Sequence, residues 1–258
     1  MPGAKRVNRT YETVSGVRTT RINDLGQPIG PAMPDWTPRP VPAPLELSGR
    51  YCRLVPLAVE HAAGLYAAVT ADPSGRQWTY LSYGPFAGLD EFTDFLSSTI
   101  ADHGYVTLTV LDASTGAPLG WASYLRINPE IGTVEIGGVT FGSALQRTPA
   151  ATEAQYLLAA HAIEDLGYRR YEWKCDDLHA GSRAAAARLG FRYEGTWRKA
   201  IMYKGRSRDT AWFAITDDDW TKLGPVIESW LDPSNFDDGR QRTALSELTA
   251  QVRAELDG

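Results

Sequence analysis

The stretch VEIGGVTFGSALQRTPAATEAQYLLAAHAIEDLG, residues 134–167, decides the fold of this chain. Its segment 134–141 is rich in β-branched residues and ends in an aromatic residue, which predicts a strand. A polar loop follows over 142–149. Apolar residues then recur at three- and four-residue spacing from Thr152 to Leu166, which predicts a helix with one buried face. Thr152 is the expected N-cap of this helix, and Gly167 is expected just after its end.

A strand that leads through a short loop into a helix is a common anion-binding arrangement. The first N–H groups of a helix have no partner within it, and the helix dipole places partial positive charge at the same end. Arg147 adds a full positive charge to the loop. The stretch therefore predicts either a phosphate site or an ordinary strand–loop–helix connection, and the pattern alone does not separate the two.

The segments on either side predict a mixed sheet. Further strands are expected at 45–57, 105–111, 119–127, 170–175, 191–197 and 209–216. Further helices are expected at 59–70, 90–103, 177–189, 220–230 and 243–256. Strands alternate with helices in the centre and hairpins flank them. We therefore predict an α/β fold of the α+β type, with a mixed, mostly antiparallel central sheet flanked by helices.

The two ends of the chain differ from its centre. Residues 1–44 are rich in proline and weakly hydrophobic, which predicts an extended N-terminal arm. Trp36 is the exception in this arm, and we expect it to dock on the folded body. Residues 45–220 form the predicted main domain, and residues 221–258 form a predicted helical C-terminal extension.

Composition excludes several classes of function. The chain has 258 residues, of which 43% are hydrophobic, and a net charge of −5, so it can bury a core and lacks the basic balance of many nucleic-acid-binding proteins. It has no apolar run of membrane-spanning length and no hydrophobic signal core. We therefore expect a cytoplasmic protein that binds neither membrane nor nucleic acid. Cys52 and Cys175 lie in apolar strand-like runs and are expected to be buried free thiols.

Several local motifs stand out along the chain. They are WTYLSYGPF at 78–86, QRTPAATEA at 146–154, RYEWKC at 170–175, SRAAAARLGF at 182–191 and EG at 194–195. In this order they resemble the GNAT superfamily of acyl-CoA N-acyltransferases, and most closely its RimJ/RimL-type branch of ribosomal-protein N-acetyltransferases. The resemblance covers residues 45–220. It implies a GNAT fold and transfer of an acetyl group from acetyl-CoA to a primary amine by direct attack in a ternary complex.

The resemblance also implies which residues bind acetyl-CoA. The phosphate loop of the family is usually written Q/R-x-x-G-x-G/A, and Arg147 is assigned to its first position. This assignment places Ala150 and Thr152 where glycine would let the backbone approach a pyrophosphate closely. His179 stands where the branch often has an asparagine that contacts CoA. The implied cofactor-binding residues are Val139, Thr140, Phe141, Arg147, Thr148, Ala150, Ala151, Thr152, His179 and Ser182.

Two residues are candidates for acid–base catalysis. Glu135 lies among apolar neighbours in the predicted strand, where a raised pKa would suit a general base that acts directly or through water. The alternative is a strand-surface glutamate or one paired with an arginine. Ser182 stands where this branch often has a serine near the CoA sulfur, so it is the candidate acid for the leaving thiolate. The alternative is a first-turn serine that satisfies helix backbone.

The aromatic loop supplies candidates for the acceptor pocket. These are Trp78, Tyr80, Tyr83 and Phe86, which could instead form a core cluster. Cys175 and His179 are of zinc-binding type, but a further ligand set is missing, so no metal is predicted. The expected partners are a small-molecule or peptide amine and, in a homodimer, a second copy of the chain. The alternative function is a catalytically weak CoA- or peptide-binding module of the same fold.

Overall fold

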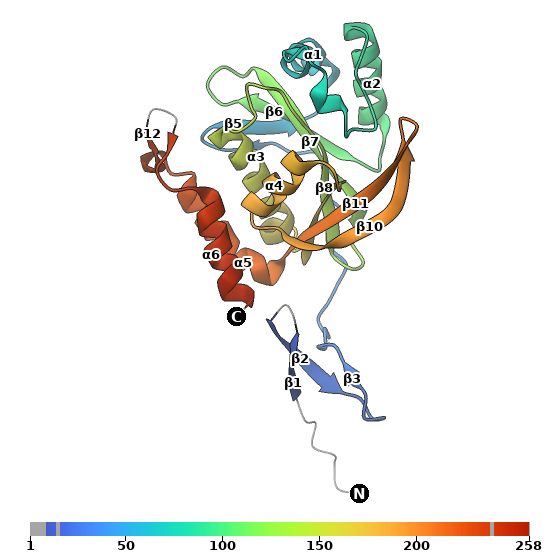
Figure 1. Ribbon diagram of the computed structural model, residues 1–258, viewed down its shortest axis with the longest axis vertical. Helices are drawn as coiled ribbons and strands as arrows, with labels where there is room; N and C mark the ends of the chain where they lie inside the picture. The colour runs from blue at the N-terminus through green and yellow to red at the C-terminus, as the bar shows by residue number, and fades with distance from the viewer. Residues whose placement is uncertain (1–8, 14–15, 238–239, 258) are drawn as a thin grey trace, which may run out of the picture.

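The computed structural model describes residues 9–13, 16–237 and 240–257, and a large sheet runs through their centre (Figure 1). Its strands are Leu47–Ser48 (β4), Cys52–Pro56 (β5), Val106–Asp112 (β6), Pro118–Asn128 (β7), Thr133–Phe141 (β8), Arg170–Asp176 (β9), Arg192–Tyr203 (β10) and Arg206–Thr216 (β11). They lie in the order β10–β11–β9–β8–β7–β6–β5–β4, and only β8 and β9 are parallel. The predicted α/β fold with a mixed, mostly antiparallel sheet is confirmed.

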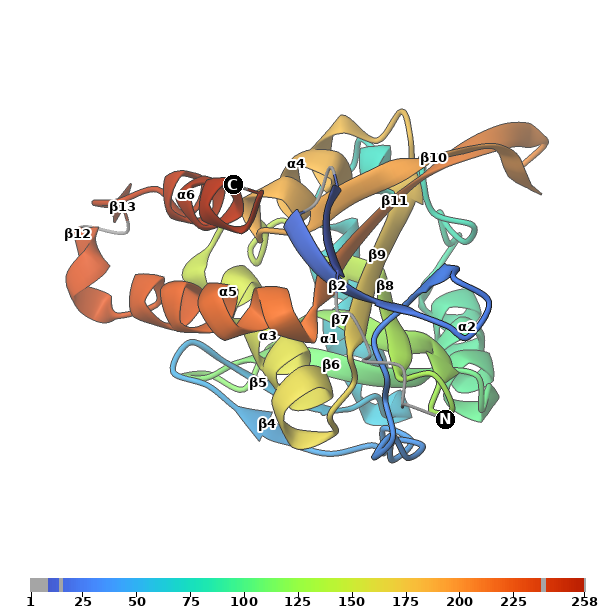
Figure 2. The ribbon, with the colours of Figure 1, turned by 90° about the horizontal axis from the view of Figure 1, so that it is seen from below.

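Helices cover both faces of this sheet. They are Ala62–Thr70 (α1), Leu89–Ala101 (α2), Pro149–Ala160 (α3), Ala180–Arg188 (α4), Asp217–Trp230 (α5) and Leu245–Asp257 (α6). Successive strand residues face opposite sides. Accordingly, Ala122 and Tyr124 of β7 join the larger core with α3 and α5, while Trp121 joins a second core with α1 and α2. The helices on the two faces therefore enclose the sheet between them (Figures 1 and 2).

The central helix begins earlier than its hydrophobic pattern predicts. The N-cap of α3 is Thr148, whose Oγ1 accepts a hydrogen bond from the Ala151 N–H at 3.2 Å, and the predicted N-cap Thr152 lies one turn inside. Pro149 explains the shift, because its fixed φ suits the first helical position and it has no N–H to lose there. The helix ends in a π-helical turn, His161–Asp165, and Gly167 then takes φ +73°, as its predicted position after the helix requires.

Two further elements differ from their predicted bounds. Helix α4 begins at Ala180 rather than at 177, because Asp176 closes a turn in which its Oδ1 accepts the Leu178 N–H at 2.9 Å. Strands β10 and β11 are longer than predicted and meet in a tight turn. Lys204 and Gly205 form this turn with φ of +48° and +69°, as a two-residue hairpin requires.

The N-terminal arm contains strands that the prediction of an extended segment overlooked. Strands Arg9–Thr13 (β1), Gly16–Ile22 (β2) and Pro28–Ile29 (β3) form a small antiparallel sheet, and the many β-branched residues of β2 account for it. Residues 1–8 and 14–15 of the arm, and 238–239 and 258 of the extension, lie outside the described residues. Trp36 docks as expected, with its indole N–H donating to the Glu130 carbonyl at 2.8 Å. No described helix is long and apolar enough to span a membrane.

Candidate functional site

The parallel pairing between β8 and β9 stops half way along both strands. It runs from the pair Thr133–Arg170 to the pair Ile136–Trp173, whereas β8 continues to Phe141 and β9 to Asp176. Beyond Ile136 the two facing edges have no ladder partner in each other, so their backbone groups are available to a ligand. Gly138, at φ +58°, marks an irregularity of β8 at this point.

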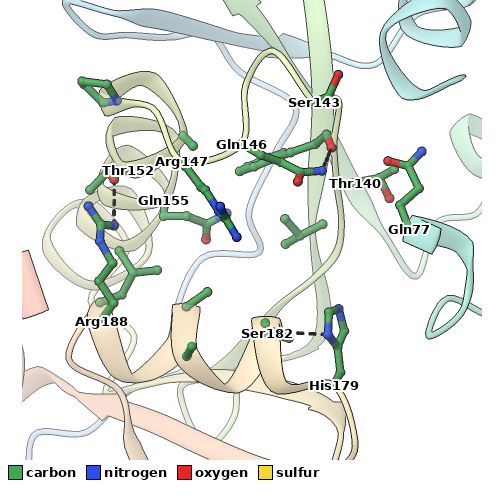
Figure 3. Close-up of a pocket in the computed structure, with 18 of the residues that line it drawn as sticks. Gln77, Thr140, Ser143, Gln146, Arg147, Thr152, Gln155, His179, Ser182 and Arg188 are labelled. Carbon is green, nitrogen blue, oxygen red and sulfur yellow. Dashed lines mark hydrogen bonds between the residues drawn. The ribbon is translucent and has the colours of Figure 1, made fainter. Parts of the chain in front are cut away.

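A cavity of about 1230 Å³ lies at this divergence, between the starts of α3 and α4. Figure 3 shows Arg147 and Gln155 extending into it from the region of α3, opposite His179 and Ser182 from the start of α4. The volume exceeds that of most small-molecule sites, so an elongated ligand fits better than a compact one. The predicted site residues that line it are Tyr80, Val139, Thr140, Phe141, Arg147, Ala151, Thr152, His179 and Ser182.

The start of α3 presents positive charge but few free N–H groups. Pro149 has no N–H, and the N–H of Ala151 already donates to Thr148 Oγ1. Arg147 compensates from a left-handed backbone position, φ +63°, with its side chain toward the cavity. Across the cavity, Arg188 Nη1 donates to Thr152 Oγ1 at 3.0 Å, and burial lowers the pKa of this arginine. Two guanidinium groups therefore face one end of the cavity, where an anion would be held.

Ser182 is oriented by the neighbouring strand. The Trp173 indole N–H donates to Ser182 Oγ at 3.0 Å, and an indole can only donate. Ser182 is therefore the acceptor in this bond, and its own hydrogen remains for another atom. Because both side chains line the cavity, that atom can belong to a bound ligand.

His179 is the N-cap of α4 and holds a defined position. Its Nδ1 accepts the Ser182 N–H at 3.4 Å, and its ring stacks on Tyr80 with centroids 4.4 Å apart. Burial lowers its pKa from the usual value, so the imidazole is neutral at neutral pH, with its hydrogen on Nε2. Among the described residues no cluster of His, Cys, Asp and Glu could hold a metal ion, so Cys175 and His179 do not converge on one.

The aromatic loop divides between the cavity and the core. Tyr80 lines the cavity, whereas Trp78, Tyr83 and Phe86 pack against α1 and α2 in the second core. The Tyr83 hydroxyl lies 2.7 Å from Thr140 Oγ1, and burial raises the pKa of Tyr83 to about 12. Three of the four aromatic residues predicted for the acceptor pocket therefore do not line the cavity, and of these Tyr83 contacts the lining residue Thr140.

Glu135 lies apart from the cavity lining. Its Oε2 is 2.8 Å from Lys174 Nζ and 3.3 Å from Arg126 Nε, and the residue is only 6% exposed. Lys174 also pairs with Glu172 at 2.9 Å and lies over the Trp212 ring. Burial raises the pKa of Glu135, while the two cations act in the opposite direction. Glu135 therefore reaches a ligand in the cavity only through an intervening group.

The residues that line the cavity differ in part from the predicted cofactor-binding residues. Thr148 and Ala150 were implied as cofactor ligands, but Thr148 caps the helix and Ala150 packs on the core. Gln146 and Pro149, two further residues of the motif at 146–154, line the cavity instead. Other lining residues without a predicted role include Gln155, Trp173 and Arg188, which lie in or beside the motifs quoted above. Asp72, Arg76, Trp230, Phe236, Arg240 and Gln241 lie outside those motifs.

Comparisons with known proteins agree with this geometry. The family model described as Acetyltransferase (GNAT) domain matches residues 52–192, and the chain belongs to this family. A GCN5-related N-acetyltransferase from Brucella melitensis is 40% identical over 84% of this chain and all of its own, with a TM-score of 0.82. A GNAT-family protein from Chromobacterium violaceum is 38% identical over 76% of this chain and 98% of its own, with a TM-score of 0.71.

More distant structures share the fold alone. The ribosomal L7/L12 alpha-N-protein acetyltransferase RimL is 19% identical over 70% of this chain and 98% of its own, with a TM-score of 0.59. No curated protein matched the chain. Family membership supports transfer of an acetyl group from acetyl-CoA.

Proposed function

We propose that this protein transfers an acetyl group from acetyl-CoA to a primary amine, by direct attack within a ternary complex. The observation that carries the proposal is the cavity at the divergence of β8 and β9. Its two guanidinium groups, from Arg147 and Arg188, suit the pyrophosphate of CoA. The oriented hydroxyl of Ser182 suits the thioester sulfur, and the end near Tyr80 is left for the amine.

The reaction needs one proton removed and one supplied. The amine nitrogen attacks the thioester carbonyl carbon, and the oxyanion forms next to the open edge of β8 at residues 139–141, where backbone N–H groups stabilise it. The C–S bond then breaks and the electron pair leaves with sulfur. Ser182 passes a proton to this thiolate and is reprotonated from water, while the Trp173 indole holds its oxygen in place.

Removal of the amine proton falls to Glu135, acting through water. Burial raises the pKa of its carboxyl group, which makes the carboxylate a better base than an exposed one. The direct contacts with Lys174 and Arg126 hold the carboxylate off the cavity, so a water chain has to carry the proton. We expect Glu135→Gln to lower kcat at neutral pH, with a loss that shrinks as pH rises and more amine is already neutral.

The acceptor is a protein N-terminus or a small-molecule amine, as in the RimJ/RimL-type branch. The likeness to RimL supports this branch through the fold, and RimL itself acts on ribosomal protein L7/L12. The cavity end near Tyr80, Gln77 and Leu81 is open to an amine on a small molecule or at the end of an extended peptide. These side chains offer aromatic, amide and aliphatic contacts, and Asp72 and Arg76, which also line the cavity, add one charge of each sign.

The proposal is tested by a transfer assay with a panel of amines. The purified protein is incubated with acetyl-CoA and peptides of varied N-terminal residue, polyamines, amino acids or amino sugars, and both CoA release and the acetylated product are measured. Arg147→Ala should weaken acetyl-CoA binding by about 1–3 kcal/mol, the range for a lost charge-assisted contact. Arg198→Ala is the matched control, since Arg198 is exposed on β10 outside the cavity. Equal affinity for both variants would place the phosphates elsewhere.

A CoA- or peptide-binding module without turnover is the second candidate. The observation that favours it is the ion pairing of Glu135 outside the cavity, which leaves this candidate base without direct contact with the reacting amine. The same assay separates the two functions. A module would bind acetyl-CoA in an Arg147-dependent way and release no acetylated product from any amine of the panel.

A further inference from the structure

The C-terminal extension forms one wall of the cavity. Trp230 at the end of α5 lines it, together with Phe236 of the strand Phe236–Asp237 (β12) and Arg240 and Gln241, which make up the strand Arg240–Gln241 (β13). These residues follow the part of the chain that the family model matches, 52–192. Both views place β12 at the end of the molecule opposite the tip of β10 and β11 (Figures 1 and 2).

This wall is firmly attached to the body. Phe236 packs edge-on against Trp230, with centroids 5.0 Å apart, and against Tyr51 next to β5 at 6.2 Å. The Asn235 side chain bridges both sides of the hairpin, donating to the Trp230 carbonyl and accepting the Thr243 N–H, each at 3.0 Å. The described residues of β12 and of the segment after β13 are therefore held against the body.

The wall also adjoins the residues expected to hold the pyrophosphate. The Arg188 guanidinium lies 4.8 Å from the Trp230 ring centroid while it donates to Thr152 at the first turn of α3. From α6, the Thr249 hydroxyl donates to the Arg188 carbonyl at 3.1 Å. The extension thus supports the arginine from two sides. A ligand whose pyrophosphate lies between Arg147 and Arg188 meets the β12–β13 hairpin next.

A buried amide between these parts indicates that a polar ligand completes this end of the cavity. Gln155 of α3 is 6% exposed and lines the cavity, and neither atom of its amide has a hydrogen-bond partner among the described residues. An unpaired buried amide is costly. Figure 3 shows the Gln155 side chain directed between Arg147 and Arg188. Polar atoms of a ligand at this place would satisfy it.

We infer that the extension recognises the 3′-phosphorylated adenosine end of CoA, with Arg240 binding the 3′-phosphate and Phe236 contacting the adenine. This rests on the acetyl-CoA role proposed above. The chemistry matches in both parts: a phosphomonoester dianion pairs with a guanidinium, and a flat heterocycle packs on an aromatic ring. The extension then sets the preference for CoA over carriers that lack the 3′-phosphate.

The test compares CoA with 3′-dephospho-CoA by isothermal titration calorimetry on the full chain. Arg240→Ala should weaken CoA binding about tenfold, a loss that charge-assisted hydrogen bonds typically produce, and change 3′-dephospho-CoA binding less than about twofold. Arg242→Ala is the matched control, because Arg242 follows Arg240 on the same hairpin but pairs with Asp237 at 3.6 Å and does not line the cavity. It should leave both affinities unchanged.

The outcomes separate this inference from the proposed function. If the wild-type protein binds CoA and Arg240→Ala binds it equally well, or loses CoA and 3′-dephospho-CoA equally, the recognition of the 3′-phosphate by the extension is wrong while the acetyl-CoA site stands. If the wild-type protein binds neither compound, both the site and this inference fall.

Discussion

Ser182 shows how one hydrogen bond decides what a side chain can do. A serine hydroxyl can donate or accept, and in a helix first turn it often satisfies backbone instead of acting on a ligand. Here the Trp173 indole donates to the oxygen, so the hydroxyl hydrogen goes to another acceptor, either the neighbouring Cys175 sulfur or a ligand in the cavity. Trp173 is therefore a positioning residue for the acid that we assign to Ser182.

The proposed roles of Ser182 and Trp173 can be tested with two conservative variants. Ser182→Ala should lower kcat at or below the low end of the ~10²–10⁴-fold range of general acid–base catalysis, with little change in KM for acetyl-CoA. Trp173→Phe keeps a ring for the edge-on packing against Phe191 and removes only the donor, so it should produce part of the same loss. The double variant should be no worse than Ser182→Ala. Additive losses in steady-state kinetics would show that Trp173 acts independently of Ser182.

The buried carboxyl group of Glu135 should make the free energy of unfolding depend on pH. Burial raises its pKa above 4.5, so the native carboxyl keeps its proton at pH values where the unfolded one has lost it. In that window the native state binds more protons, and the contribution of Glu135 to the free energy of unfolding falls as pH rises. Glutamine does not titrate, so Glu135→Gln removes this pH-dependent fall in stability. Lys174 remains paired with Glu172 in the variant.

Urea unfolding of both proteins from about pH 4 upward measures this effect. The free energy of unfolding of Glu135→Gln minus that of the wild type should increase with pH above the unfolded pKa of 4.5. A difference that decreases with pH would mean that Lys174 and Arg126 outweigh burial and hold the carboxylate ionised.

The candidate site was predictable only where its residues share one segment. Arg147, Thr152 and Ser182 lie in motifs that can be read along the chain, His179 lies between two of these motifs, and all four residues line the cavity. Arg188 also lies in a motif, at 182–191, but the motif does not mark it as a cavity residue, because it faces the cavity only after α4 has packed beside α3. Ala150 does not line the cavity, because Pro149 starts the helix earlier than the apolar pattern does and Ala150 packs against the core.

At the scale of elements, the long hairpin of β10 and β11 holds the aromatic loop. At its tip, Lys204 Nζ donates to the Trp78 and Tyr83 carbonyls at 2.8 and 2.9 Å, and the Arg206 guanidinium donates to the Thr79 carbonyl. These bonds join segments more than a hundred residues apart. They fix the loop that carries Tyr80 to the acceptor end of the cavity.

Lys204→Asn should loosen this loop without disturbing the turn. Asparagine tolerates the left-handed backbone at φ +48° but cannot reach the two carbonyls. We expect faster amide hydrogen exchange over residues 79–84 and a several-fold higher KM for the amine, with KM for acetyl-CoA unchanged. Lys199→Asn is the control, since Lys199 also has a positive φ, +51°, and does not hold the loop. Equal effects of the two variants would contradict a role for the hairpin tip.

The existence of most elements could be predicted, but their bounds could not. Strand β8 and helix α2 have strong alternation or helical periodicity and lie close to their predicted limits. Strand β10 is largely exposed, and register shifts interrupt it between Tyr193 and Gly195 and between Trp197 and Ile201. The alternation of its side chains is therefore lost after residue 197, where the predicted strand ends. The small sheet of the arm was hidden by the prolines that follow it.

At the scale of the whole molecule, Trp36 ties the N-terminal arm to the body. Its ring lies against Gly132, where an added Cβ would come within 2.4 Å of it, and the Arg39 guanidinium lies 4.1 Å from its centroid. Trp36→Ala should remove this contact. Limited proteolysis should then cleave near residues 33–41 much faster than in the wild-type protein. Equal cleavage rates in the two proteins would show that other contacts fix the arm.

Every role proposed for the cavity residues depends on where acetyl-CoA binds. A crystal structure of the protein with acetyl-CoA tests this most directly. We predict the pantetheine in the divergence between β8 and β9, the pyrophosphate between Arg147 and Arg188, and the thioester sulfur within hydrogen-bond distance of Ser182 Oγ. Acetyl-CoA bound at another place, or in this cavity with its sulfur remote from Ser182, would contradict the account.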